Sequence, residues 1–260
     1  MKKSSLSSSV ASFVREKLAR PLLPHQVLNE LNRNDRTGAL YRAWGYVFSN
    51  QIRGAYYEFG VYRGDSFRAS YHVCRKFRLW QREQLGAEEP WRRQVAEGYA
   101  ASHHYFYAFD TFAGMPTNQE GNPVFAPGNF ACSLADFNRL NKEAGLPDGP
   151  WVRFFAGEFA QVAKKEAPAL AQLDCAAVIN IDCDLYASAR DALALVEPKI
   201  QQGSVLLMDD WNHFKARPDT GSRKALAEFL KRRTDLSVEP WFSYEFVGQA
   251  FFIHRRSVGE

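Results

Sequence analysis

The sequence predicts an α/β fold in which helices cover both faces of a mostly parallel sheet. Two features lead to this fold class: short, continuous apolar runs that indicate buried strands, and helical stretches that separate them. The five apolar runs are residues 55–59, 105–109, 152–155, 176–181 and 204–208. Two further strand-like stretches, residues 243–246 and 250–254, bring the expected sheet to seven strands.

Helices are expected between these strands, and two of them carry a clear end signal. The expected helices are residues 66–77, 134–144, 188–196 and 222–232. Gly145 follows the second of them, and glycine is common just beyond a helix C-terminus. Pro198 follows the third, and proline cannot continue a helix. The alternation of strand and helix therefore runs from residue 55 to the end of the chain.

Residues 1–54 are expected to form an N-terminal helical cap, and residues 55–260 the α/β domain. The cap has apolar residues at helical spacing at its start, namely Val10, Phe13, Val14 and Leu18. A second apolar stretch runs from Leu40 to Phe48. Nothing in the cap carries chemistry, which leaves three roles open: a lid, a wall of a substrate pocket, or a contact that forms a homo-oligomer.

Composition excludes several classes of protein. Hydrophobic residues make up 46% of the 260 residues and charged residues 24%, which is ordinary for a globular protein. The net charge is +4, but acidic residues are interspersed among the basic ones, so we expect solvated helix faces and no nucleic-acid partner. The four cysteines lack metal-binding or disulfide spacing. No stretch predicts a membrane span or a good signal peptide, so a cytoplasmic location is expected.

Acidic residues follow two of the expected strands. Asp182 and Asp184 come after residues 176–181, and the pair Asp209-Asp210 comes after residues 204–208. Carboxylates at the ends of adjacent parallel strands converge on one crevice, where they repel each other unless a cation or a proton intervenes. Because an all-carboxylate shell suits Mg²⁺ or Mn²⁺, the sequence predicts a site for one of these ions. Taken singly, Asp184 could instead cap a helix and the pair could belong to a turn.

A glycine-containing turn follows the first strand. It holds Gly60 and Gly64 but has neither the glycine pattern of dinucleotide-binding proteins nor the lysine of a phosphate-binding loop. Glu58, two residues before the first glycine, suits a cationic ligand group such as the ammonium of an amino acid. Asp110 ends the second strand, where a carboxylate can accept hydrogen bonds from ribose hydroxyls.

Four ordered motifs carry a resemblance to a known family: EFGVYRGDS, FDTFAGMP, IDCDLY and LLMDD. Together they resemble the macrocin/mycinamicin O-methyltransferases over about residues 55–254. The resemblance implies a Rossmann-like class I methyltransferase fold and S-adenosylmethionine as cofactor. It also implies a Mg²⁺-dependent transfer of a methyl group to a hydroxyl of a sugar, of a glycosylated natural product or of a polysaccharide.

Roles for individual residues follow from the same resemblance. It assigns the S-adenosylmethionine loop to Glu58, Gly60, Gly64 and Ser66, the ribose contact to Asp110, and an adenine contact to Glu158. It assigns the metal ligands to Asp182, Asp209 and Asp210, and the general base to Asp184. An ion held there would lower the pKa of the acceptor hydroxyl, and Asp184 would remove its proton. His213 is an alternative base or a substrate contact.

Two departures from the family pattern concern the acceptor. The chain between Gly64 and Asp110 is about twice the usual ~20 residues, so we expect residues 75–104 to lengthen the first helix. Trp211 follows the acidic pair where tyrosine is more common in the family. The N-terminal cap and the loop of residues 116–130 are expected to select the acceptor, a small molecule or glycoside.

Two alternative functions stay open at this point. A metal-dependent glycosyltransferase also ends an apolar strand in Asp-x-Asp, although the glycine turn and the later acidic pair argue against it. A non-catalytic cofactor-binding protein is the other alternative.

Overall fold

The structure is a computed structural model and describes residues 34–256 apart from residues 101 and 148. The helix expected around residues 10–18 lies outside the described residues. The sheet has seven strands in the order β3-β2-β1-β4-β5-β7-β6, and β7 runs antiparallel to both of its neighbours. The strands are β1 Ala55–Phe59, β2 Phe106–Asp110, β3 Val152–Ala156, β4 Ala176–Ile181, β5 Ile200–Met208, β6 Leu236–Tyr244 and β7 Gly248–Arg255. The predicted fold class is confirmed.

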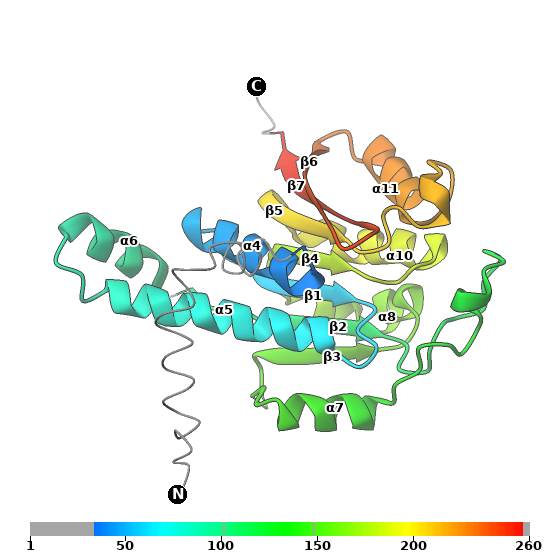
Figure 1. The fold of residues 1–260 in the computed structure, drawn as a ribbon, viewed down its shortest axis with the longest axis horizontal. Coiled ribbons are helices and arrows are strands. Elements are labelled where there is room, and N and C mark those ends of the chain that lie inside the picture. The colour runs from blue at the N-terminus through cyan, green and yellow to red at the C-terminus, as the bar shows by residue number, and fades with distance from the viewer. Residues whose placement is uncertain (1–33, 101, 148, 257–260) are drawn as a thin grey trace, which may run out of the picture.

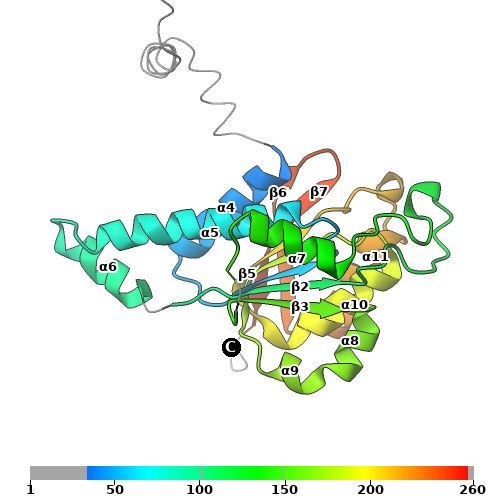
Figure 2. The same ribbon diagram turned by 90° about the horizontal axis from the view of Figure 1, so that it is seen from below.

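Helices cover both faces of the sheet, as predicted (Figure 1 and Figure 2). One face carries α4 Arg36–Ser49, α5 Asp65–Gln84 and α7 Leu134–Glu143. The other carries α8 Phe159–Lys165, α9 Ala167–Ala171, α10 Tyr186–Val196 and α11 Gly221–Arg232. A further helix, α6 Pro90–Ala100, lies against the far end of α5. Within the described residues there are also three 3₁₀ turns: η2 Pro123–Phe125, η3 Glu197–Lys199 and η4 Phe214–Ala216.

Alternate side chains of the strands build two hydrophobic cores, one on each face. Phe59 and Ile181 belong to the core under α8, α10 and α11, and Tyr56 belongs to the core under α4 and α5. Trp44 of α4 is fully buried in the second core, and its indole Nε1–H donates to the hydroxyl of Ser70 at 2.8 Å. The apolar face of α4 is therefore used on the chain's own sheet, while the homo-oligomer contact stays a prediction.

Several elements differ from their predicted bounds. β5 begins at Ile200 instead of residue 204. β6 begins at Leu236, seven residues before the expected residue 243, because only two residues of this edge strand are buried and it contains Pro240 instead of a continuous apolar run. The short helices α8 and α9 were not predicted.

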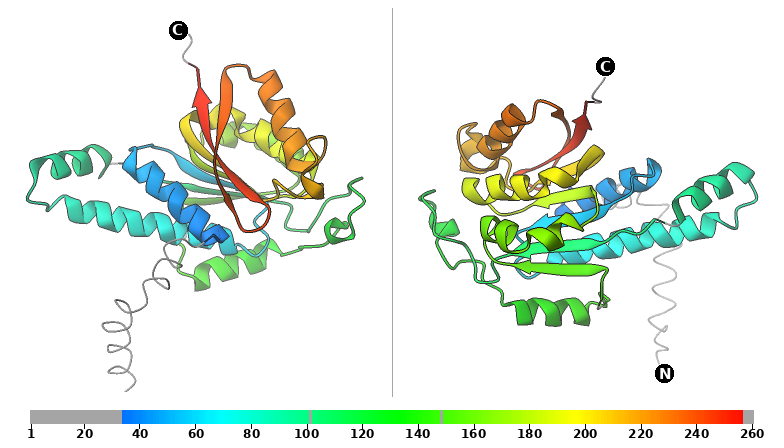
Figure 3. Two further views of the ribbon diagram at one scale, coloured as in Figure 1. Left: turned by 45° about the horizontal axis from the view of Figure 1, so that its top comes forward. Right: turned by 180° about the vertical axis from the view of Figure 1, so that it is seen from behind.

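The first helix is longer than its expected bounds, as predicted, since α5 runs to Gln84. The rest of the expected extension forms a separate helix, α6, and α5 and α6 together form an arm that projects beyond the sheet (Figure 3).

No helix in the described part of the chain is both long and apolar enough to cross a membrane. All four cysteines are free thiols, in agreement with their spacing.

Gly60 fixes how closely β1 approaches β4 at the edge of the sheet where the acidic residues gather. Its φ is +85°, and a Cβ added there would lie 1.8 Å from the carbonyl oxygen of Asp182. Any side chain at residue 60 would thus push the residue after β1 away from the residue after β4.

We expect Gly60→Ala to lower the free energy of unfolding by about 2 kcal/mol or more, because it adds backbone strain to a collision with backbone. Gly98→Ala is the matched control, since a Cβ there meets nothing within 4 Å and helix α6 gains a better helix former. Urea unfolding of both variants measures the difference. Equal stability of the two would contradict this account of Gly60.

Candidate active site

A cavity of about 620 Å³ opens at the carboxyl-terminal ends of the parallel strands. Every parallel strand sends one residue to its wall, either at its end or just after it: Gly60, Asp110, Glu158, Asp182 and Asp209. This is the place where open α/β sheets bind ligands, and the volume is in the range usual for small-molecule sites. Of the sequence-predicted residues, all but Glu58 line this cavity.

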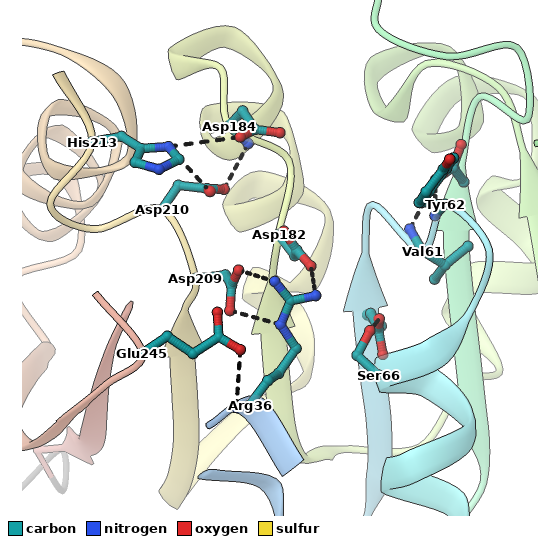
Figure 4. Close-up of polar contacts among 12 residues, drawn as sticks. Arg36, Val61, Tyr62, Ser66, Asp182, Asp184, Asp209, Asp210, His213 and Glu245 are labelled. Atoms are coloured by element: carbon teal, nitrogen blue, oxygen red, sulfur yellow. Dashed lines mark hydrogen bonds and ion pairs between the residues drawn. The ribbon is translucent and has the colours of Figure 1, made fainter. Parts of the chain in front are cut away.

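The turn after β1 is held in place by Asp110. The backbone N–H groups of Val61 and Tyr62 donate to Asp110 Oδ2 at 2.8 and 3.0 Å, and that of Phe112 donates to Asp110 Oδ1 at 2.7 Å (Figure 4 shows Val61 and Tyr62). Gly64 has a left-handed φ of +83° and is the N-cap of α5. Both predicted glycines therefore sit at backbone conformations that side chains disfavour, and the turn presents the start of α5 to the cavity.

Glu58 lies behind this turn and is fully buried. The hydroxyl of Tyr56 donates to its Oε2 at 2.5 Å, and the hydroxyl of Ser66 donates to its Oε1. Burial raises the pKa of Glu58 to about 7, although the two hydroxyl donors oppose the shift. In the structure Glu58 thus anchors Ser66, which lines the cavity, instead of reaching the cavity itself.

Three carboxylates meet at the ends of β4 and β5. Oxygen atoms of Asp182, Asp209 and Asp210 lie within 4.8 Å of one another, and Asp209 and Asp210 are buried. Burial, together with the neighbouring carboxylates, raises the pKa of Asp182 and of Asp210 well above the usual value. The oxygen-only donor set and its spacing fit a hard divalent cation such as Mg²⁺ or Mn²⁺.

An arginine from the N-terminal region lies against two of these carboxylates. Arg36 Nη1 is 2.9 Å from Asp182 Oδ2, Nε donates to Asp209 Oδ1 at 3.1 Å, and Nη2 pairs with Asp209 Oδ2 (Figure 4). Burial lowers the pKa of Arg36, but the carboxylates of Asp182, Asp209 and Glu245 outweigh burial and hold it above its usual range. Arg36 therefore supplies positive charge to Asp182 and Asp209 in this structure.

Asp184 and His213 form a second group beside the first. The backbone N–H of Asp184 donates to Asp210 Oδ2 at 2.8 Å, and His213 Nδ1 lies 3.4 Å from Asp210 Oδ1 and 3.7 Å from Asp184 Oδ1. Burial, then the charge of Asp182, raises the pKa of Asp184 to about 7, whereas burial lowers that of His213. Asp184 does not cap α10, because the N-cap residue of that helix is Leu185.

The loop of residues 116–130 closes one side of the cavity. Glu120 Oε1 accepts a hydrogen bond from the backbone N–H of Tyr186 at 2.8 Å, which ties the loop to the start of α10. The ring of Phe125 lies 5.5 Å from that of His213 and 5.8 Å from that of Phe214. Phe125 and Phe214 thus form an aromatic wall beside the second acidic group.

Two further aromatic residues near the acidic pairs, Trp211 and Tyr186, make contacts outside the cavity. Trp211 packs on Phe251 with ring centroids 4.9 Å apart and lies under the guanidinium of Arg223. The hydroxyl of Tyr186 donates to Glu228 at 2.6 Å. Neither lines the cavity, so the departure from tyrosine at residue 211 affects packing behind the site.

Sequence reasoning missed Arg36, Glu120 and Asn180. A signal for Arg36 exists: it is the first residue of a helix, where a cation is disfavoured by the helix dipole unless a carboxylate holds it. Asn180 of β4 is fully buried, and its side-chain amide has no hydrogen-bond partner among the described residues. No sequence signal distinguishes Glu120 from other acidic loop residues.

The fold, the cavity at the strand ends and the turn after β1 define a class I methyltransferase. The family model for macrocin O-methyltransferase (TylF) matches residues 92–237, more than half of the chain. The chain therefore belongs to this family and is an S-adenosylmethionine-dependent O-methyltransferase, which settles the choice against a glycosyltransferase and a non-catalytic protein. The match begins at α6, so the turn after β1 lies outside it.

Solved structures share the fold. The O-methyltransferase NovP matches with a TM-score of 0.61 and 21% identity, covering 85% of this chain and 79% of NovP. The calicheamicin methyltransferase CalS11 matches with a TM-score of 0.56 and 20% identity, covering 92% of this chain and 83% of CalS11. No curated protein matches the chain.

The buried Glu58 makes stability depend on pH. Its folded-state pKa of about 7 lies above the ordinary 4.5, so the folded chain binds a proton that the unfolded chain releases earlier. The contribution of Glu58 to stability is therefore fully present below about pH 4.5 and is lost as the pH rises through about 7.

We expect Glu58→Gln to reduce the loss of unfolding free energy between about pH 5 and pH 8 by about 1–3 kcal/mol, since the amide does not titrate. Urea unfolding at a series of pH values measures this slope. Glu228→Gln, which changes an exposed carboxyl on α11, should leave the slope as in the wild type. An unchanged slope in Glu58→Gln would show that the carboxyl of Glu58 is not the group responsible.

Proposed function

We propose that the enzyme methylates a hydroxyl group of a sugar, carried on a small molecule, a glycosylated natural product or a polysaccharide, with the help of Mg²⁺ or Mn²⁺. The observation that carries this proposal is the meeting of four aspartates with the turn after β1 in one cavity. CalS11 is a TDP-rhamnose 3'-O-methyltransferase, which supports the inclusion of sugar nucleotides among the acceptors to be tested.

The cofactor would lie across the ends of β1, β2 and β3. Gly60, Gly64 and Ser66 allow close approach of the ligand to the start of α5, where N–H groups face the cavity. The carboxylate of Asp110 accepts three backbone N–H groups and would use its remaining lone pairs to accept hydrogen bonds from the ribose hydroxyls. Glu158 would contact the adenine. Glu58 would act through Ser66.

The acceptor would lie between the acidic groups and the aromatic wall. A divalent ion held by Asp182, Asp209 and Asp210 would lower the pKa of the acceptor hydroxyl. Asp184 would accept the proton of that hydroxyl, and its pKa of about 7 is close to the value that suits a general base at neutral pH. His213, beside Asp184, would orient the acceptor or serve as the alternative base.

The N-terminal region completes this side of the cavity. Arg36 and Glu245 line it together with Phe125 of the loop of residues 116–130. We therefore propose that residues 1–54 act as a cap on the methyltransferase domain of residues 55–260, and that cap and loop together select the acceptor.

Transfer of labelled methyl groups from S-adenosylmethionine, with and without Mg²⁺, tests the proposal over a panel of glycosides, sugar nucleotides and phenols. We expect label on a sugar hydroxyl, loss of transfer in excess EDTA, and recovery when Mg²⁺ is added back. Full transfer in excess EDTA would contradict the proposed role of the metal. Label on phenols alone would contradict the proposed sugar acceptor.

Asp184→Asn tests the general base. We expect a turnover about 10²–10⁴-fold lower with unchanged affinity for S-adenosylmethionine, because the amide cannot take the proton. The wild-type rate should rise with pH as Asp184 loses its own proton, and Asp184→Asn should lose this rise. Asp191→Asn is the matched control, since Asp191 lines the same cavity but pairs with Arg190 at 2.8 Å. Wild-type turnover in Asp184→Asn would assign the proton to another group, with His213 the first to test.

A further inference from the structure

The guanidinium of Arg36 contacts carboxylate oxygens that a divalent cation would need as ligands. Its guanidinium engages both oxygens of Asp209 and the Oδ2 of Asp182, which are two of the three proposed metal ligands (Figure 4). Arg36 comes from α4, on the opposite side of the glycine turn in sequence from the acidic residues, so the contact joins the N-terminal region to the ends of β4 and β5.

The two positive charges exclude each other at these oxygens. Mg²⁺ binds carboxylate oxygens at about 2.0–2.1 Å and demands a regular arrangement of ligands. An ion on Asp182 and Asp209 would then lie within contact distance of the guanidinium nitrogens, where like charges repel strongly in a partly buried place. With the two hydrogen bonds of Arg36 to Asp209 and its ion pair with Asp182 in place, each oxygen of Asp209 already gives one of its lone pairs to the guanidinium.

A third carboxylate, that of Glu245, also lies beside Arg36. The backbone N–H of Arg36 donates to Glu245 Oε1 at 3.1 Å, and the backbone N–H of Glu245 donates to the carbonyl of Asn34 at 2.6 Å. Glu245 lies in the turn between β6 and β7, with a left-handed φ of +48°, and it lines the cavity beside Arg36. The side chain of Arg36 is 32% exposed and lines the cavity, so open space lies beside it.

We propose that Arg36 is an internal counter-ion that competes with the divalent cation for Asp182 and Asp209, so that the arginine-bound form and the cation-loaded form exclude each other. This proposal rests on the metal ligands of the proposed function. In the arginine-bound form Arg36 neutralises the buried carboxylates. In the cation-loaded form the side chain of Arg36 lies away from Asp182 and Asp209, on the side of Glu245. The start of α4 therefore differs in position between the two forms.

Direct titration with Mn²⁺ tests this competition without cofactor or acceptor. Binding is measured by calorimetry and by the loss of the free Mn²⁺ signal in electron paramagnetic resonance. We expect Arg36→Met, which keeps the length of the side chain and removes its charge, to bind Mn²⁺ at least about 10-fold more tightly than the wild type, a change of about 1.4 kcal/mol. Arg42→Met should bind like the wild type, because Arg42 is on the same helix but lies over the ring of Phe242.

Thermal unfolding gives a second readout. In metal-free buffer Arg36→Met should unfold at a lower temperature than the wild type, because the buried carboxylates lose their counter-ion. Added Mn²⁺ should raise its Tm more than that of the wild type. If Arg36→Met does not fold, Arg36→Lys takes its place: one ammonium cannot make the forked contact, so Mn²⁺ should still bind more tightly than to the wild type.

Equal Mn²⁺ affinity of the wild type and Arg36→Met, or weaker binding by the variant, would overturn the competition. Absence of Mn²⁺ binding to both proteins would overturn it together with the metal part of the proposed function. The sugar acceptor is tested separately by the transfer of labelled methyl groups, so a failure of that part of the proposed function remains distinguishable from a failure of this proposal.

Discussion

Mutual repulsion of carboxylates at the ends of β4 and β5 is the constraint on which the rest of the site depends. Asp182, Asp209 and Asp210 are held together by two parallel strands whose register leaves them no room to separate. Such a cluster is stable only where positive charge or protons are supplied. Arg36 supplies such charge in the structure, so the start of α4 is tied to the ends of β4 and β5 by ion pairs as well as by the packing of its apolar face.

The other half of the cavity is organised by hydrogen bonds instead of charge. Asp110 gathers the backbone N–H groups of Val61, Tyr62 and Phe112, and Glu58 gathers the hydroxyls of Tyr56 and Ser66. Asp110 thus pairs two N–H groups of the glycine turn, and Glu58 pairs hydroxyls of β1 and α5 on either side of it. The turn after β1 is therefore held by hydrogen bonds to carboxylates, whereas the acidic half is held by the ion pairs of Arg36.

The sequence was sufficient for the sheet and for the residues that follow its parallel strands. Continuous apolar runs locate buried strands, and parallel strands bring their ends together, so Asp110, Asp182 and Asp209 could be placed in one crevice. The edge strand β6 was misplaced because half of its residues face solvent and give no such run. Local pattern could not name the partners of Arg36 and Glu120, because these partners lie 146 or more and 66 residues away along the chain.

The bond between Glu120 and Tyr186 has a consequence for the evolution of specificity. Tyr186 begins α10 only two residues after Asp184, so the loop that closes one side of the cavity is bonded to the segment that bears the candidate base. A loop exchanged between relatives would bring a new pocket but lose this fastening unless it also carried an acceptor at the position of Glu120. Chimeric enzymes in this family should therefore be cut outside the fastening point, so that loop and helix start are inherited as one unit.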